Sequence, residues 1–396
     1  MFKRAGTGLK GMLAAAVVAG VAMVCAPAAH AQMGAEWGQL FDPPVNSREM
    51  EQIEKTLKLD DAQTALVEDL QSAMLAEFER LSGIMRQIVQ DAQEEVRETG
   101  RNDVWVEIGK KAQDFGEKKK SMQKQLFEDI KLVLNEEQLG RWPAAERRWY
   151  RGQMMGNRQL GFMSGLRADL VVITEDMQLS AEQAEAIAPV VDQYEREVDR
   201  ELHAFEDLAE EQKEEWEKLR EDGFFTNMDK FNELFSDLRD KLVTVRDLNG
   251  KYRDQIALRL EGEAKSKFEN AYDKAAFPAL YKDSYVDAGM RTVLEMPDLT
   301  TEQRAEVEAL EARYGQEVAA LNKKIEKATL DADETVNIQT LMSGGAKSEE
   351  KNALEAQKKD LQQERYAQLR AILTEEQAAK LPSPEGDDWR NTKLDF

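Results

Sequence analysis

The stretch Leu299-Thr300-Thr301-Glu302-Gln303 decides the fold of this chain, because its pattern occurs five times along the sequence. Three copies open equivalent segments, with Gln63, Gln183 and Gln303 spaced 120 residues apart each time, and two copies close a segment. A fixed period of this kind indicates a repeated architecture. The motif residues are Leu59, Asp60, Gln63, Leu134, Asn135, Gln138, Leu179, Ser180, Gln183, Leu299, Thr300, Gln303, Leu373, Thr374 and Gln377.

The motif has the chemistry of a helix start. Its second residue is always Asp, Asn, Ser or Thr, the residues whose side chains cap helix N-termini. The glutamine three residues later can reach back to the backbone N–H of the cap and complete a capping box. A sixth copy is expected near residue 262, but the stretch 260–264 lacks both the cap and the glutamine. We interpret that stretch as a degenerate copy.

Apolar residues after Thr300 recur every three or four positions, which indicates one face of a long helix. Glycines break this pattern in each repeat, at Gly100, Gly223 and Gly344. Each repeat is therefore interpreted as two antiparallel helices of about 35 to 40 residues, near 55 Å long. The predicted fold is all-α, with three tandem long antiparallel helical hairpins joined by shorter connecting helices.

The sequence suggests the following organisation, in which Pro143 and Pro278 begin the two connecting helices because proline fits the first helical turn. The segments are a signal peptide (1–31), an N-terminal segment (32–55), hairpin unit 1 (56–142), a connecting helix (143–175), hairpin unit 2 (176–276), a second connecting helix (277–297), hairpin unit 3 (298–381) and an irregular tail (382–396).

The N-terminus has the form of a secretory signal. Lys3, Arg4 and Lys10 precede an apolar run, and Ala29-His30-Ala31 has the small-x-small pattern of a cleavage site. The run is about 13 residues long, whereas a membrane span takes about 20. We expect cleavage after Ala31, with an uncleaved membrane anchor as the alternative. The prediction is an exported protein, periplasmic or extracellular, with no transmembrane span after cleavage.

The net charge and the scarcity of cysteine and histidine exclude several classes of function. The formal net charge is −23, and loss of Lys3, Arg4 and Lys10 would make it −26, which disfavours nucleic acid as a partner. The only cysteine, Cys25, lies in the predicted signal, and His203 is the only histidine that follows it. Catalytic Cys/His pairs and multi-histidine zinc sites therefore have no residues to form from. We predict no enzyme activity, no cofactor and no metal site.

The motif resembles the signature of the periplasmic LTXXQ family, the CpxP- and Spy-like envelope stress proteins. The match is complete at Leu299, Thr300 and Gln303 and again at Leu373, Thr374 and Gln377. The resemblance implies an all-α protein of helical hairpins that forms a homodimer and acts in ATP-independent chaperoning, envelope stress sensing or, in one branch, metal binding. This chain is about three family units long and looks like tandem copies.

The first connector is the most distinctive surface candidate. Between Arg141 and Arg167 it holds six arginines and one acidic residue, Glu146, a local charge of +5 with aromatic residues interleaved. Two interpretations stay open: the segment packs across acidic helices, or it forms a docking face, because arginine and large aromatics anchor interfaces. The candidate protein-binding residues are Arg141, Trp142, Arg147, Arg148, Trp149, Tyr150, Arg151, Arg158 and Phe162.

The leading functional hypothesis is an exported, non-enzymatic protein that binds other proteins, including unfolded clients, as an ATP-independent chaperone or envelope stress protein. One alternative is a structural, scaffolding envelope protein with the hairpins as beams. The other is a metal-responsive sensor.

Overall fold

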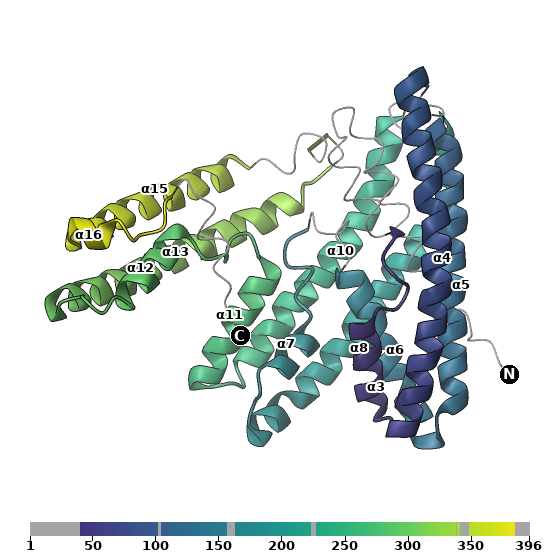
Figure 1. Ribbon diagram of the computed structural model, residues 1–396, viewed down its shortest axis with the longest axis horizontal. Helices are drawn as coiled ribbons and strands as arrows, with labels where there is room; N and C mark the ends of the chain where they lie inside the picture. Colours follow the sequence, from purple (N-terminus) through teal and green to yellow (C-terminus); the bar gives the residue numbers. More distant parts are fainter. Residues whose placement is uncertain are drawn as a thin grey trace. The chain divides into compact units, whose positions relative to one another are not determined.

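The computed structural model describes residues 40–101, 104–156, 163–222, 227–337, 339–340 and 348–384. Within these ranges all regular secondary structure is helical, so the predicted all-α class is confirmed (Figure 1). The predicted signal peptide, Gly223, Gly344 and residues 385–396 of the predicted tail lie outside the described residues. Across the described ranges, none of the helices combines the length and apolar character that crossing a membrane requires.

The described chain divides into two compact units. The chain passes from the first to the second at Arg259 and Leu260, and the short stretch 176–178 also belongs to the second. The first unit contains α3 (Ser47–Leu57), α4 (Asp61–Thr99), α5 (Val104–Val133), α6 (Glu136–Gly156), α7 (Leu170–Asp176, except its last residue), α8 (Ala181–Glu211), α9 (Lys213–Asp222) and α10 (Met228–Ala257). The second contains α11 (Gly262–Ala276), α12 (Tyr285–Leu294), α13 (Thr301–Asp333), α15 (Glu349–Ile372) and α16 (Glu375–Ala378).

Helices α4 and α5 pack along one another and run antiparallel. The Gln63 side chain near the start of α4 bonds the Val133 carbonyl at the end of α5, and Phe78 meets Phe115 at a ring distance of 5.9 Å. Helix α4 ends at Gly100, whose left-handed φ of 70° suits glycine. One stripe of α4, with members every three or four residues, is buried: Val67, Gln71, Met74, Phe78, Ser82, Met85, Val89 and Ala92.

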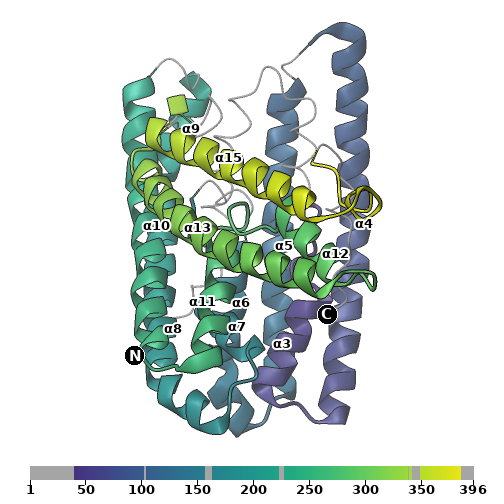
Figure 2. The same cartoon turned by 90° about the vertical axis from the view of Figure 1, so that its left-hand side faces the viewer.

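Helices α8 and α10 form a second antiparallel pair. Glu197 of α8 pairs with Lys251 of α10, and Gln212 at the end of α8 donates to Asp237, so sequence positions fall on α10 as they rise on α8. Fully buried Val198 and Phe205 extend the α8 side of this core. In both views of the first unit α8 and α10 lie close together (Figures 1 and 2).

Helix α3 begins in the segment 32–55, where no helix was predicted, and its last two residues fall in the predicted hairpin unit 1. Asn46 caps it, with the Glu49 carboxylate returning a bond to the Asn46 backbone N–H at 2.8 Å. Its buried residues Met50, Ile53 and Leu57 join one core with Trp142 of α6. The helix thus covers one side of α6.

The first connector begins earlier than predicted. Helix α6 starts at Glu136 and passes through Pro143, because Asn135 and Gln138 already supply the capping bonds at the start. In place of one helix over 143–175, the described residues contain α6 and the short α7. The closing copy of the motif therefore opens the connecting helix.

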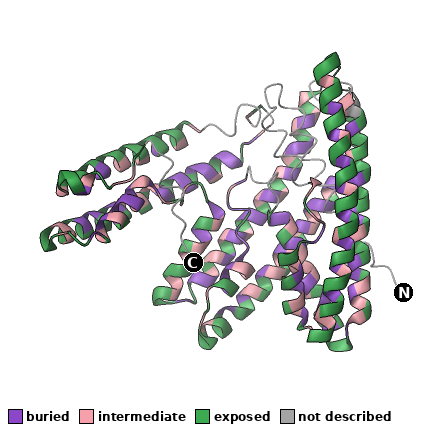
Figure 3. Ribbon diagram, viewed as in Figure 1, coloured by how far each residue is buried: buried purple, intermediate pink, exposed green. Residues whose placement is uncertain are grey.

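The second unit repeats the antiparallel arrangement with α13 and α15. Gln303 at the start of α13 bonds the Ile372 carbonyl at the end of α15, and Arg365 pairs with Glu317 at 2.8 Å. Buried and exposed residues alternate along α13, as they do along α4 of the first unit (Figure 3). Helix α12 packs on this pair through Val286, Met290 and Val293.

The predicted connector 277–297 is only partly helical. Pro278 lies in a turn after α11, and α12 begins at Tyr285. Ser284 caps α12 through the backbone N–H groups of Val286 and Asp287. A capping residue, not the proline, therefore fixes where this connecting helix starts.

Candidate functional site

The five motif copies all cap helices in the same way. The side chains of Asp60, Ser180, Thr300 and Thr374 accept the backbone N–H of the glutamine three residues later, and each glutamine side chain returns a bond to the cap. Asn135 and Gln138 make the same two bonds, at 2.9 and 3.0 Å. These pairings satisfy N–H groups that a helix start leaves without a partner.

Gln63 and Gln138 also bond to each other. Gln63 Nε2 donates to Gln138 Oε1 at 2.8 Å, and Gln138 Nε2 donates to Gln63 Oε1 at 2.7 Å. The same amide nitrogens reach the carbonyls of Val133 and Lys58. This glutamine clasp ties the start of α4, the end of α5 and the start of α6 together.

A second glutamine clasp occurs in the other unit. Gln303 Nε2 donates to Gln377 Oε1 at 3.0 Å, and Gln377 Nε2 donates to the Asp298 carbonyl at 3.1 Å. The middle repeat has no equivalent, because Ala264 stands where the partner glutamine of Gln183 would be. Helix α11 begins there with Glu261 making no side-chain capping bond and Gly262 at φ 55°.

Of the five described arginines of the first connector, Arg167 is exposed, and the other four make ion pairs within the first unit. Arg147 reaches Glu195 of α8 at 3.5 Å, and Arg148 holds Glu175 of α7 at 2.6 Å. Arg141 pairs with Glu137 and donates to the Leu57 carbonyl at 3.2 Å. Arg158 and Phe162 lie outside the described residues.

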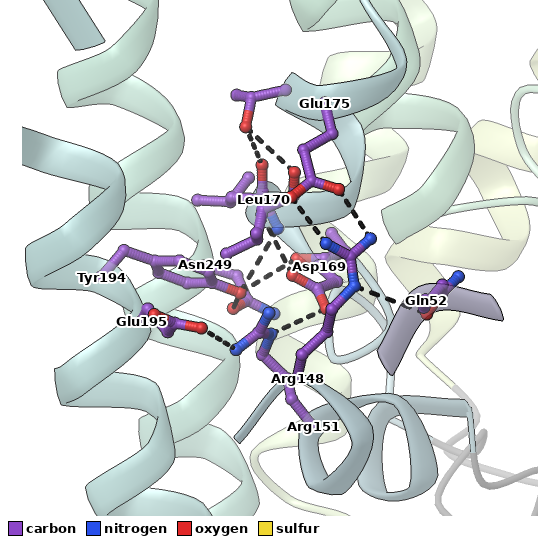
Figure 4. A network of polar contacts seen from close by, with 12 residues as sticks. Gln52, Arg148, Arg151, Asp169, Leu170, Glu175, Tyr194, Glu195 and Asn249 are labelled. Atoms are coloured by element: carbon purple, nitrogen blue, oxygen red, sulfur yellow. Dashed lines mark hydrogen bonds and ion pairs between the residues drawn. The ribbon is translucent and has the colours of Figure 1, made fainter. Parts of the chain in front are cut away.

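Arg151 is the centre of the network shown in Figure 4. Its side chain is 0% exposed, and it contacts Asp169 at 2.7 Å and Glu195 at 3.1 Å. Asp169 comes from the loop before α7 and Glu195 from α8, so one guanidinium joins three segments of the chain. Charge-assisted bonds of this kind are strong where water is excluded.

Electrostatics at this network follow from burial and charge. Burial lowers the pKa of Arg151, but Asp169 and Glu195 outweigh it and raise the pKa above its usual value. The pKa of Tyr150 is raised well above its usual value, first by burial and then by Glu206. Both groups therefore stay protonated at neutral pH, and the arrangement is suited to holding the helices in place.

Two further residues complete the network. Asn249 of α10 donates to the carbonyls of Gly165 and Leu166 at 2.9 and 3.1 Å, and it accepts the hydroxyl of Tyr194. The sequence does not identify Asn249, because its partners Tyr194, Gly165 and Leu166 lie more than 50 residues away along the chain. Nothing local distinguishes Asn249 from an exposed helix residue.

The aromatic residues of the connector face the core. Trp142 and Trp149 both meet Phe127 edge-on, at ring distances of 5.2 and 5.0 Å. Tyr150 donates its hydroxyl to the Leu202 carbonyl and lies against His203. Of the two interpretations of this connector, the described side chains have the geometry of packing across acidic helices.

The described residues contain no group of three His, Cys, Asp or Glu side chains that could hold a metal ion. Their exposed large apolar side chains are Leu66, Ile84, Leu132, Leu139 and Leu258.

Comparisons with protein families, with curated proteins and with solved structures found no match for this chain.

Proposed function

We propose that this chain is an exported, non-enzymatic protein that binds other polypeptides and holds unfolded clients without nucleotide, as an envelope stress protein would. The observation that carries the proposal is a pair of exposed leucines. Leu132 at the end of α5 is 83% exposed, and Leu258 at the end of α10 is 79% exposed.

The two leucines occupy the same place in the repeat. Each lies two residues before the leucine of a closing copy, Leu134 or the degenerate Leu260. Single exposed leucines are common on protein surfaces. Recurrence at one repeat position supports a role in contact with apolar partners.

The surroundings support reversible holding. Glu128, Asp129 and Glu136 lie within four residues of Leu132, and the chain carries a net charge of −23. Like charge keeps a protein dispersed while it carries an apolar client. The client would be released because its apolar contacts with the leucines are weak.

The experiment is light scattering from a heat-denatured client at stoichiometric ratios of this protein. We expect delayed aggregation, and a smaller delay with Leu132→Glu/Leu258→Glu. Ala371→Glu is the matched control, because exposed Ala371 occupies the equivalent position in the third repeat. No delay at any ratio would contradict client holding, and an unchanged double variant would contradict the leucine site.

A further inference from the structure

Exposed apolar side chains gather at one end of the first unit. Of the five large apolar side chains that are exposed among the described residues, three lie within one helical turn of the glutamine clasp between Gln63 and Gln138. Leu66 lies three positions after Gln63, and Leu139 directly follows Gln138. Leu132 precedes the residue whose carbonyl accepts a bond from Gln63. These clasp-end leucines, Leu66, Leu132 and Leu139, are 51%, 83% and 42% exposed.

The clasp-end leucines border the core at this end of the unit. Leu59, Leu70 and Val133 are partly buried and pack against the core that contains Trp142. Leu70 lies one turn after Leu66 on the same side of α4. The exposed leucines are therefore the outer margin of a larger apolar surface, and surfaces of this kind mark sites of interaction.

The second unit shows that the clasp itself does not require these leucines. Its clasp forms with the same capping bonds and the same bond from a glutamine to a carbonyl at the end of the partner helix. There, the positions equivalent to the clasp-end leucines carry Glu306, Ala371 and Ala378. The helix ends meet with one charged and two small residues in these places, so the leucines of the first unit are available for a contact outside it.

The surroundings of the clasp-end leucines are strongly acidic. Residues 58–69 and 128–141 include eight acidic and three basic residues, so their net charge is −5 over 26 residues, against −23 over 396 for the whole chain. Lys131 pairs with Glu128 and Arg141 pairs with Glu137, so two of the three cations are already neutralised. Negative charge is thus denser here than in the chain as a whole, and it is complementary to a partner with positive charge.

We propose that the clasp-end leucines bind polypeptide segments in which apolar residues are flanked by lysine or arginine. The leucines cover the apolar residues of the segment, and the acidic residues of 58–69 and 128–141 attract its flanking cations. The inference rests on the proposed function, since it names the class of client that the protein holds. Segments flanked by aspartate or glutamate are repelled from the same surface.

The binding test uses two fluorescein-labelled peptides with the same leucine-rich centre, one flanked by lysines and one by glutamates. Fluorescence anisotropy at about 50 mM salt should show that the lysine-flanked peptide binds about tenfold more tightly or better. At about 500 mM salt the difference should shrink, because salt screens exposed charges. Equal affinities at low salt would overturn the charge preference.

Alanine variants test the place of binding. Each clasp-end leucine is matched by an alanine at the equivalent position of another repeat, namely Ala186, Ala371 and Ala378. The variant Leu66→Ala/Leu132→Ala/Leu139→Ala should therefore keep its helices, as circular dichroism checks, and should bind the lysine-flanked peptide about tenfold more weakly. The control is Ile84→Ala, an exposed apolar residue of α4 far from the clasp, which should leave the affinity unchanged.

Charge variants test the source of the preference. One variant neutralises three exposed carboxylates near the clasp: Glu68→Gln/Asp69→Asn/Glu136→Gln. Its control neutralises three exposed carboxylates near the other end of α4: Asp91→Asn/Glu94→Gln/Glu98→Gln. The net charge changes equally in both, and only the first should reduce the preference for the lysine-flanked peptide, by about threefold or more. An equal reduction in both would overturn the local origin of the preference.

Client aggregation separates failure of this inference from failure of the proposed function. If the protein delays aggregation while the triple alanine variant binds the lysine-flanked peptide as tightly as the parent, client holding stands and the clasp-end site is wrong. If the peptide binds at the clasp-end leucines while aggregation is not delayed at any ratio, client holding is wrong and the docking surface stands.

Discussion

Gln63 and Gln138 exchange two side-chain hydrogen bonds although 75 residues separate them in the sequence. Each glutamine already completes a capping box, so one residue type fixes both a helix start and the place where helix ends meet. Gln303 and Gln377 repeat the arrangement in the second unit with one direct bond. The clasp is absent from the middle repeat, where the two compact units divide.

Removing a glutamine clasp should lower the free energy of unfolding more than removing a capping box alone. Gln63→Ala removes the bond to the Asp60 backbone, the bond to Val133 and both bonds to Gln138, so we expect destabilisation by about 2 to 3 kcal/mol. Gln183→Ala is the control, because Gln183 makes the same capping bonds without a partner glutamine, and we expect about 1 kcal/mol. Urea unfolding measures both, and equal losses would show that the clasp adds nothing.

Removal of the buried guanidinium should be among the most damaging single changes. Arg151→Met leaves Asp169 and Glu195 without their shared cation in a site closed to water, which should cost about 3 to 5 kcal/mol. The comparison variant is Arg80→Ala, which breaks an exposed pair and should shift the urea midpoint little. A similar midpoint for both variants would contradict the structural role of Arg151.

Stability should rise with pH in the weakly alkaline range because of Lys119. Burial lowers the pKa of Lys119 from 10.5 to about 8, although Asp42 and Glu49 oppose this. Between these values the unfolded chain holds a proton that the folded chain has lost, so the free energy of unfolding increases with pH, by up to about 3 kcal/mol.

The check is urea unfolding at intervals from pH 7 to pH 10. Lys119→Met should flatten the rise, and Lys124→Met, at an exposed position of the same helix, should not. Buried tyrosines set the upper limit of this pH range. Burial raises the pKa of Tyr314 to about 12, so above the usual tyrosine pKa near 10 the unfolded chain loses a proton that the folded chain keeps, and the free energy of unfolding falls. If the free energy of unfolding still rises with pH in Lys119→Met, groups other than Lys119 cause the rise.

Two substitutions would give the degenerate motif copy at 260–264 a complete capping box. Glu261→Thr with Ala264→Gln supplies the cap and the glutamine that α11 lacks, and should stabilise this helix by about 1 kcal/mol. The single change Ala264→Gln is the control, since it restores only half of the capping box. The thermal unfolding midpoint should rise in the double variant, and a fall would show that the backbone at Gly262 does not accept the capped geometry.

Local chemistry predicted much of the fold. The helices that begin after Asp60, Ser180, Thr300 and Thr374 are capped by hydrogen bonds between residues three positions apart. The local sequence therefore suffices to predict these helix starts. Helix α3 has a similar local signal, Asn46 followed by Glu49, but these residues do not match the repeated motif from which the other helix starts are predicted. Pro143 was misleading, since a proline also fits inside a helix whose start is fixed upstream.

The sequence by itself determined that this protein is helical and where its long helices begin, because caps, glycine breaks and apolar periodicity act over one or two turns. Only the tertiary structure decided that Gln63 meets Gln138 and that Arg151 is enclosed by Asp169 and Glu195. These relationships depend on which helices pack together, and that choice is made by contacts between residues far apart in the chain.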